Sequence, residues 1–393
     1  MQVPFRLVAV LRPSVHGAVL AAVGVATVVF SASPFLIDEV ADHYELGLSS
    51  AALISTAQLG GFGIASFGAG RTLAGRRHVF VIAALALVLA NVLSALVPPL
   101  PVLVGLRVVA GLAMGVTSWM AWSMVFGHEG ETSEVSMVGP MVGIVAAPVI
   151  APVVQLGGIS ATYLMLSLWA LVPLGLAWLL SVPEAPPVRV EPRRGAATVD
   201  GAGSIADGGR HRPVPAAFVI LISLALFSAG GSSVWMFTAV FGEERGISIT
   251  VLAWAYSANA VAGVISARWP SERGPAGLWV AATGGLALLV CAYPNATFQL
   301  VAMALWGFFF WMGLPAAFTL LAAKSRYPEE RAGDAQAYLA AGRVLGPTLG
   351  GLTLDYGGAT ALGFVAAAVM IGAGLMLVVT ARTGNKHTQV GVL

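Results

Sequence analysis

The chain contains few charged residues and almost no cysteine. Asp, Glu, Lys and Arg make up 10% of its 393 residues, whereas soluble domains carry roughly 25%. The chain therefore has too few charged side chains to cover its whole surface in water. Its single cysteine, Cys291, excludes an internal disulfide framework and any metal site built from several cysteines. The formal net charge of +2 provides no basic field for nucleic acid, and no nucleic-acid partner is expected.

The chain also lacks the short motifs of common enzymes. It has no G-x-x-x-x-G-K-[ST] phosphate-binding loop, and neither H-E-x-x-H nor G-x-S-x-G occurs. These absences argue against an enzyme and against ATP-driven transport by this chain alone. No cofactor and no metal site is expected.

Long apolar runs dominate what is present. Hydrophobic residues make up 58% of the chain and the mean hydropathy is +0.87. Runs near ~20 residues are long enough to cross a ~30 Å hydrocarbon core. Twelve occur, at about 15–37, 48–69, 78–98, 101–124, 136–156, 160–182, 216–240, 249–269, 276–294, 297–322, 334–355 and 358–381. We therefore expect an all-α integral membrane protein with twelve transmembrane helices, the first an uncleaved helix rather than a signal peptide.

Lys and Arg side chains are distributed unevenly between the two sets of loops. With a cytoplasmic N-terminus, seventeen of the twenty fall in cytoplasmic segments and only Arg245 falls in an outer loop. The remaining two, Arg107 and Arg343, lie within spans. Because basic residues favour the cytoplasmic side, we expect a multi-pass protein of the plasma (inner) membrane with both termini in the cytoplasm.

The longest polar interval divides the spans into two sets of six. Residues 183–215 are rich in proline, glycine, alanine and arginine and show no helical period, so we expect a flexible cytoplasmic linker. A regulatory or lipid-binding segment is the alternative. The expected organisation is a six-helix bundle at 1–182, the linker at 183–215 and a second six-helix bundle at 216–393.

A glycine–proline pattern occurs once in each half. Span five contains "GIVAAPVIAP" (143–152) and span eleven contains "GRVLGPTLGG" (342–351), and the two begin 199 residues apart. Gly75 and Gly274, in two cytoplasmic loops, show the same offset. Small residues let helices approach closely and proline bends them. Two parallel six-helix repeats around a central cavity are typical of transporters that rock around a central site.

Three motifs resemble signatures of the major facilitator superfamily. The loop "GAGRTLAGRR" has the superfamily's glycines and Gly-Arg-Arg, although Thr72-Leu73 replaces its Asp-Arg pair. Span four has "RVVAGLAMG", an arginine followed four residues later by glycine. Span eleven has the full antiporter pattern, while span five keeps only its first glycine and its proline. The matching residues are Gly68, Gly75, Arg76, Arg77, Arg107, Gly111, Gly143, Pro148, Gly342, Gly346, Pro347, Gly350 and Gly351.

The resemblance covers essentially the whole chain and implies a monomer that exports its substrate by antiport. It assigns gating or conformational roles to Gly68, Gly75, Arg76, Arg77, Gly143, Pro148, Gly342, Gly346 and Pro347. The missing Asp-Arg pair removes the loop carboxylate that helps hold the superfamily's outward-open state. Arg71 or Arg76 could still meet the carbonyl end of a helix.

Proton coupling requires a titratable group, and no carboxylate lies in the middle of a span. The candidates are Asp38 and Glu39 at the outer end of span one and Asp355 at the outer end of span eleven, each able to pair with Arg107. A solvated loop acid is the alternative for each. An arginine in hydrocarbon costs at least ~2.5 kcal/mol, so we expect Arg107 to face the interior, with snorkelling as the alternative.

The superfamily lines its cavity chiefly with spans one, four, seven and ten. Besides Arg107, the substrate-binding candidates are Ser31, Ser33, Gln58, Trp119, Trp122, Ser232, Trp235, Asn259, Trp306 and Phe310. Such a cavity is aromatic and has few hydrogen-bonding groups, which suits an amphipathic organic compound better than a sugar. Aromatic residues at the membrane interface are the alternative interpretation.

The sequence thus favours a secondary transporter in the lipid bilayer that exports a small amphipathic molecule against proton entry. An uptake carrier or facilitator for a small organic acid, with Arg107 as the carboxylate anchor, is the alternative within that class. A non-transporting receptor or scaffold is the alternative of another class.

Overall fold

The protein is helical throughout the part that the structure describes. The computed structural model describes residues 15–73, 77–125, 129–179, 212–267, 274–293, 295–326 and 328–383, and every regular element there is a helix. The helices are α2 (Gly17–Tyr44), α3 (Leu48–Ala51), α4 (Leu53–Thr72), α5 (Arg77–Ala95), α6 (Leu100–Val125), α7 (Glu129–Leu179), α8 (Pro215–Glu244), α9 (Ile249–Ala267), α10 (Ala276–Ala292), α11 (Ala296–Ala323) and α12 (Pro328–Arg382). Gly75, Arg76 and residues 183–211 of the expected linker lie outside the described residues.

Nine helices of the described residues are long and apolar enough to cross a membrane, and α10 is apolar but shorter, with 17 residues. The expectation of an all-α membrane protein is confirmed to that extent. The first helix continues seven residues beyond the apolar run that ends at 37 and carries Asp38, Glu39 and Asp42. Hydropathy marks only the part of a helix that hydrocarbon surrounds, whereas backbone hydrogen bonding continues into the polar region.

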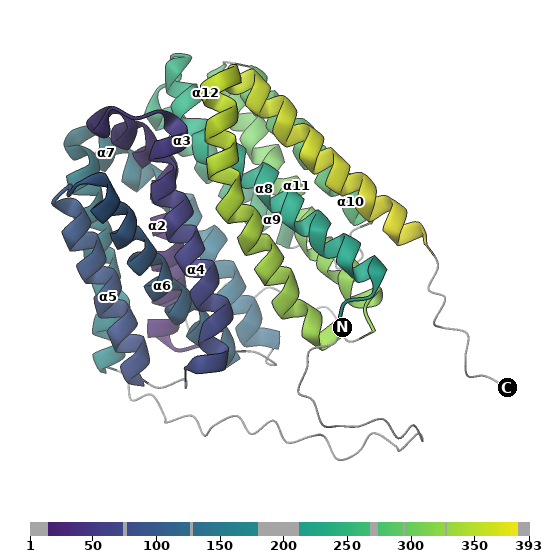
Figure 1. The fold of residues 1–393 in the computed structure, drawn as a ribbon, viewed down its shortest axis with the longest axis horizontal. Helices are drawn as coiled ribbons and strands as arrows, with labels where there is room; N and C mark the ends of the chain where they lie inside the picture. The colour runs from purple at the N-terminus through teal and green to yellow at the C-terminus, as the bar shows by residue number, and fades with distance from the viewer. Residues whose placement is uncertain are drawn as a thin grey trace.

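The two longest helices each contain one sharp bend at a glycine. α7 has 51 residues and bends at Gly158 (φ 57°), and α12 has 55 residues and bends at Gly358 (φ 70°). Positive φ is accessible to glycine without steric cost, which explains why a Gly-Gly pair stands at both bends. Each helix therefore has two arms, and the two arms of α12 meet at the upper end of the molecule in Figure 1.

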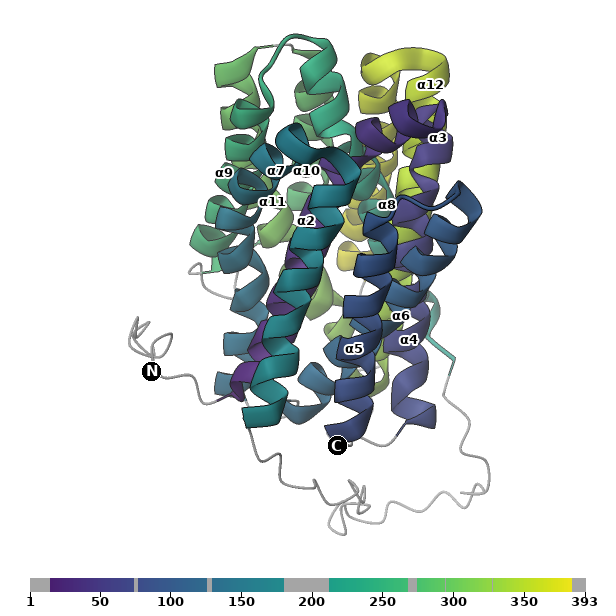
Figure 2. The ribbon, with the colours of Figure 1, turned by 90° about the vertical axis from the view of Figure 1, so that its left-hand side faces the viewer.

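The helices form two groups that lie side by side (Figure 1). In the N-terminal bundle, α2–α7, the main contacts join α2 with α7 and α4 with α6. In the C-terminal bundle, α8–α12, they join α8 with α12, α10 with α12 and α9 with α11. The bundles meet where α7 contacts α9, α4 contacts α12 and α2 contacts α8. Figure 2 places α3 and the bend of α12 at the same end of the molecule, which we call the α3 end.

Close approach of α4 and α6 depends on a glycine. A Cβ atom on Gly111 would lie 2.0 Å from the carbonyl oxygen of Gln58, which is a backbone atom and has little freedom to move away. The helices could accommodate it only by separating.

We predict that Gly111→Ala lowers the free energy of unfolding by roughly 1–3 kcal/mol, the usual range for overpacking. Gly105→Ala is the matched control on the same helix, because nothing lies within 4 Å of its new Cβ. Thermal unfolding of both variants in detergent, monitored by size-exclusion chromatography after heating, measures the difference between their unfolding midpoints. Equal midpoints would contradict the close packing of α4 against α6.

Candidate functional site

Arg107 of α6 is 1% exposed and lies inside the N-terminal bundle. Its Nη1 donates hydrogen bonds to Gln58 Oε1 (3.3 Å) and Asn91 Oδ1 (3.1 Å). Its Nη2 donates to the carbonyl oxygen of Ala90 (3.0 Å) and to Ser94 Oγ (2.6 Å). α4 and α5 supply all four acceptors, and none carries a charge. The guanidinium is therefore held in the membrane interior by neutral groups rather than by an acid.

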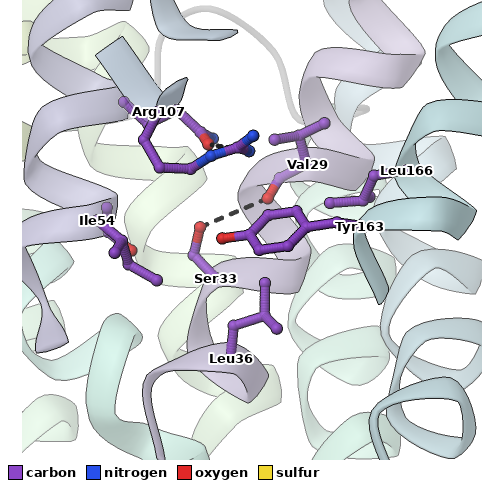
Figure 3. A pocket seen from close by; sticks show the side chains of 9 residues that line it. Val29, Ser33, Leu36, Ile54, Arg107, Tyr163 and Leu166 are labelled. Atoms are coloured by element: carbon purple, nitrogen blue, oxygen red, sulfur yellow. Dashed lines mark hydrogen bonds between the residues drawn. The ribbon is translucent and has the colours of Figure 1, made fainter. Parts of the chain in front are cut away.

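The other side of Arg107 faces Tyr163 and a small pocket (Figure 3). The guanidinium carbon lies 4.3 Å from the centre of the Tyr163 ring, a cation–π distance. Ser33 and Ser55 also line the pocket, which has room for about one water molecule. Within the described residues, Arg107 Nε and Ser55 Oγ are buried without a hydrogen-bond partner. A water molecule in this pocket is suited to satisfy both.

The acids that could couple to protons lie away from Arg107. Asp38 and Glu39 of α2 and Glu243 of α8 line one pocket between the two bundles, near the α3 end. Glu243 is close enough to both for their charges to interact, and Asp38 is likewise close to Asp42. Glu243 was not among the candidates from the sequence, whereas the structure places it in the last turn of α8, at the same pocket as Asp38 and Glu39.

No basic side chain neutralises this group among the described residues. Arg245, the residue that follows the end of α8, turns away from it. Its Nη1 donates to the carbonyl oxygen of Cys291, and its guanidinium lies 5.4 Å from the centre of the Phe241 ring. The three carboxylates at the bundle interface thus repel one another whenever all are charged.

Asp355 joins the two bundles at the α3 end. Both of its carboxylate oxygens accept hydrogen bonds from backbone N–H groups, those of Leu48 and Ser49, at 3.1 Å each. These are free N–H groups of the first turn of α3, where a negative charge is favoured. About two turns earlier in α12, the hydroxyl of Thr348 shares a 2.9 Å hydrogen bond with that of Thr56 in α4.

The proline of the first glycine–proline motif creates a second link between the bundles. Pro148 has no N–H, so the carbonyl oxygen of Ile144, four residues earlier, has no helical donor. Ser257 of α9 donates its hydroxyl to this oxygen at 2.6 Å. One turn along α9, Ala260 packs against Gly143, where a Cβ would lie 3.3 Å away. Ser257 did not stand out in the sequence, because only the structure shows which carbonyl it faces.

Other polar candidates are occupied by contacts within their own bundle. Gln58 accepts from Arg107, and Asn259 Nδ2 donates to the carbonyl oxygen of Met303 (3.0 Å), which joins α9 to α11. Ser33 donates to Val29 of its own helix, and Ser232 lies against the carbonyl oxygen of Gly342 (3.4 Å). Ser31 is partly buried and has no such contact within the described residues.

The aromatic candidates divide between the core and partly exposed positions. Trp306 is 2% exposed and lies 6.1 Å from Trp235, ring centre to ring centre. Trp235 in turn contacts Tyr256, and Phe310 stacks on Phe227 at 4.9 Å. In the N-terminal bundle Trp119 is partly buried and Trp122 is exposed.

The remaining motif residues fall into three places. Gly342 and Gly346 pack against α8, where added Cβ atoms would lie 2.2 Å and 2.6 Å from backbone oxygens. Pro347 follows Arg343 by four residues in α12, just as Pro148 follows Ile144 in α7. Gly68 lies in α4 near the end opposite α3, and Arg77 begins α5.

Comparison with known proteins identifies the family. The sequence profile of the Major Facilitator Superfamily matches residues 18–343. The chain belongs to this superfamily. The match covers most of both bundles and confirms the resemblance that the loop, span-four and glycine–proline motifs indicated. No curated protein matches the chain.

Solved transporter structures share the Major Facilitator Superfamily fold with this chain. A bacterial homologue of the human lysosomal transporter Spinster, inward-facing and unoccupied, has a TM-score of 0.67 at 13% identity over 97% of this chain and 96% of that one. The nucleoside transporter NupG has a TM-score of 0.67 at 12% identity over 92% and 98%. An auto-inhibited POT family peptide transporter has 0.68 at 12% over 94% and 96%. At these identities the likeness shows the fold alone.

Removing the Arg107 side chain leaves several buried acceptors without a donor. We predict that Arg107→Leu lowers the free energy of unfolding by about 2–5 kcal/mol, because each buried acceptor that loses its partner costs ~1–3 kcal/mol. Arg382→Leu, at the exposed end of α12, is the control and leaves stability unchanged. Thermal unfolding in detergent measures both. An unchanged midpoint for Arg107→Leu would show that the network does not hold α4, α5 and α6 together.

Proposed function

We propose that the protein is a secondary active transporter that works by alternating access, with twelve membrane crossings in two six-helix halves. Counting each arm of α7 and α12 as one crossing supports this number. The pairing of contacts supports the repeat, because α2 meets α7 and α4 meets α6 as α8 meets α12 and α9 meets α11. The observation that carries the proposal is the set of hydrogen bonds between the two bundles, because polar contacts of this kind can open and close.

We further propose that the α3 end faces outward and both termini face the cytoplasm of the plasma membrane. The excess of Lys and Arg in the opposite loops supports this orientation. The contacts of Asp355 with Leu48 and Ser49 then close the outer side. The described state is accordingly closed on the outer side. The molecule is proposed to act as a monomer, as the superfamily resemblance implies.

Protons are the proposed coupling ion, and Asp38, Glu39 and Glu243 are the proposed site of coupling. Closing the α3 end brings carboxylates of α2 and α8 to one pocket, which disfavours having all of them charged. Opening separates them and removes that repulsion. The closed state therefore binds protons more tightly than the open state, and acidification from outside drives closure.

The proposed cargo is a small amphipathic organic compound that is exported. Apolar and aromatic side chains of α8 and α11, with few free hydrogen-bonding groups, support this choice. Uptake of a small organic acid remains the second candidate. Arg107 is poorly suited to anchor such an acid, because four neutral acceptors already occupy its guanidinium.

Flux through proteoliposomes that enclose a pH-sensitive dye tests the proposal. We expect members of a panel of lipophilic cations, neutral antibiotics and aromatic acids to trigger proton movement under an imposed gradient. Glu243→Gln should abolish proton movement while exchange of the labelled compound continues, because it removes one of the interacting carboxylates. Exchange without proton movement in the wild type would make the protein a facilitator. Binding without any flux would make it a receptor.

Asp355 should hold the α3 end closed. We predict that Asp355→Ala adds a longer component to the distance distribution between spin labels at Leu156→Cys and Tyr356→Cys, two outer positions that are 90% and 89% exposed. Electron double resonance measures the distance, and Cys291 is buried and does not label. Thr353→Ala is the control, because its hydroxyl bonds only to Leu349 of the same helix. Unchanged distances in Asp355→Ala would show that Asp355 does not hold the α3 end closed.

A further inference from the structure

Arg343 lies at the middle of the first arm of α12. Fifteen residues separate it from Pro328 at the start of the helix, and fifteen separate it from the bend at Gly358. At 1.5 Å per residue each distance is ~22 Å. In a hydrocarbon core ~30 Å thick the residue is therefore near the bilayer centre, too deep for its side chain to reach either surface.

Two rows of side chains on the same arm are assigned by their contacts. Gly342 and Gly346 face α8, where their Cβ atoms would meet backbone oxygens of that helix. Ala340 and Thr348 face α4, through Gly63 and Thr56 respectively, in the opposite bundle. The surface of the arm that faces the interface between the bundles lies between these two rows.

The helical period directs Arg343 between these two rows. Leu345 and Leu349, which are 55% and 54% exposed, mark the side of the arm that faces lipid. At 3.6 residues per turn, Arg343 projects on the opposite side from these leucines. Its side chain is partly buried and points to the interface between the bundles, where alternating access requires a substrate to bind.

Arg343 has no protein partner there. Among the described residues it makes no hydrogen bond, ion pair or ring contact, in contrast to Arg107. Asp334 is nine residues earlier, ~13 Å along the helix, and pairs with Arg331. Asp355 is twelve residues later, ~18 Å along the helix, and binds the first turn of α3. A membrane-interior cation without a partner is costly and marks a functional site.

Pro347 leaves a second polar group, the backbone carbonyl of Arg343, without a helical partner at the same place. Because proline has no N–H, the carbonyl oxygen of Arg343 has no donor in its own helix. In the first half, the corresponding carbonyl, that of Ile144, binds Ser257. The guanidinium is a forked cationic donor that suits a carboxylate or another oxyanion, and the freed carbonyl oxygen beside it can accept only from a hydroxyl or N–H group of the same ligand or from water.

We propose that Arg343 binds the anionic group of the transported compound at the interface between the bundles, so that the substrate is an amphipathic organic anion rather than a cation. This inference rests on the proposed transport function and narrows its substrate class. The arginine that anchors the substrate anion is then Arg343 of span eleven rather than Arg107 of span four. The apolar body of the substrate then lies against the surrounding aliphatic and aromatic side chains.

Calorimetric titration of the purified full chain tests the proposal. The probes are 2-naphthoate, naphthalene-2-sulfonate and 2-naphthyl phosphate, with methyl 2-naphthoate as the uncharged match. We expect the wild type to bind at least one anion about ten-fold more tightly than the ester, in line with a charge-assisted hydrogen bond. Arg343→Gln should lose this preference, Arg343→Lys should keep most of it, and Arg382→Gln, a surface control, should not change it. A preference that survives in Arg343→Gln, or a wild type that prefers the ester, overturns the proposal.

Stability provides a second and independent measurement. Because Arg343 has no partner, Arg343→Gln should unfold at the same temperature as the wild type or higher. A lower midpoint would reveal a structural partner and would also overturn the proposal. Flux measurements distinguish failure of this inference from failure of the proposed transport function. Transport of lipophilic cations alone would refute the anion site but leave the transport function intact. No flux of any compound would refute the transport function itself.

Discussion

Hydrocarbon offers no hydrogen-bond partner, and this constraint determines where every polar group of the protein lies. Many hydroxyl groups inside the helices bond to carbonyl oxygens one turn earlier, as Ser94 does with Ala90 and Thr238 with Val234. The guanidinium of Arg107 is held by four neutral acceptors, which lowers the cost of a charge in the membrane without introducing an acid that could titrate. In such an environment a polar group without a partner indicates a place where water or a ligand binds.

The two glycine–proline helices follow one pattern but are used differently. In α12, Gly346 and Gly350 press against α8 and leave no room for a methyl group, since added Cβ atoms would lie 1.9 Å from Ser232 Oγ and 2.8 Å from Ser233 Cβ. In α7 the equivalent positions are Ala147 and Ala151, which are buried and fit as they are. The two prolines are equivalent in removing a backbone donor, and the Ile144 carbonyl that Pro148 frees is bound by the opposite bundle. The incomplete motif of span five thus reflects looser packing rather than a lost role for its proline.

Apolar runs and glycine–proline motifs were enough to predict the helical membrane fold and the superfamily, because hydrophobic length and small-residue spacing are properties of the chain itself. The bend at Gly158 falls in the expected loop after span five, and the bend at Gly358 falls on the first residue of expected span twelve. Two apolar runs separated by only two or three residues leave no room for a longer connection. The site was less predictable. Burial of Arg107 followed from the cost of a membrane charge, but its neutral partners did not, because they depend on how α4 and α5 rotate against α6. The contacts of Ser257 and Glu243 likewise depend on helix rotation and on packing between bundles, which local sequence does not encode. Which of the predicted residues touch substrate stays a prediction.

Alternating access requires two states that differ little in free energy, and the contacts between the bundles are of a suitable kind. A transporter that closed its outer side through a large apolar interface would remain closed, because reopening would expose that surface to water. Part of the contact between the bundles is apolar, as where the rings of Phe35 in α2 and Tyr256 in α9 lie 5.3 Å apart. Asp355 and Thr348, however, use exposed or partly buried polar groups, for which water is nearly as good a partner as the opposite bundle. In the mechanism that we propose, the carboxylates of α2 and α8 then oppose closure until a proton binds. In the centre, Arg343 is without a partner among the described residues, and in the proposed mechanism an anion that pairs with it would lower the energy of the intermediate through which the bundles rock. The same residue would thus select the substrate and make the conformational change depend on its presence.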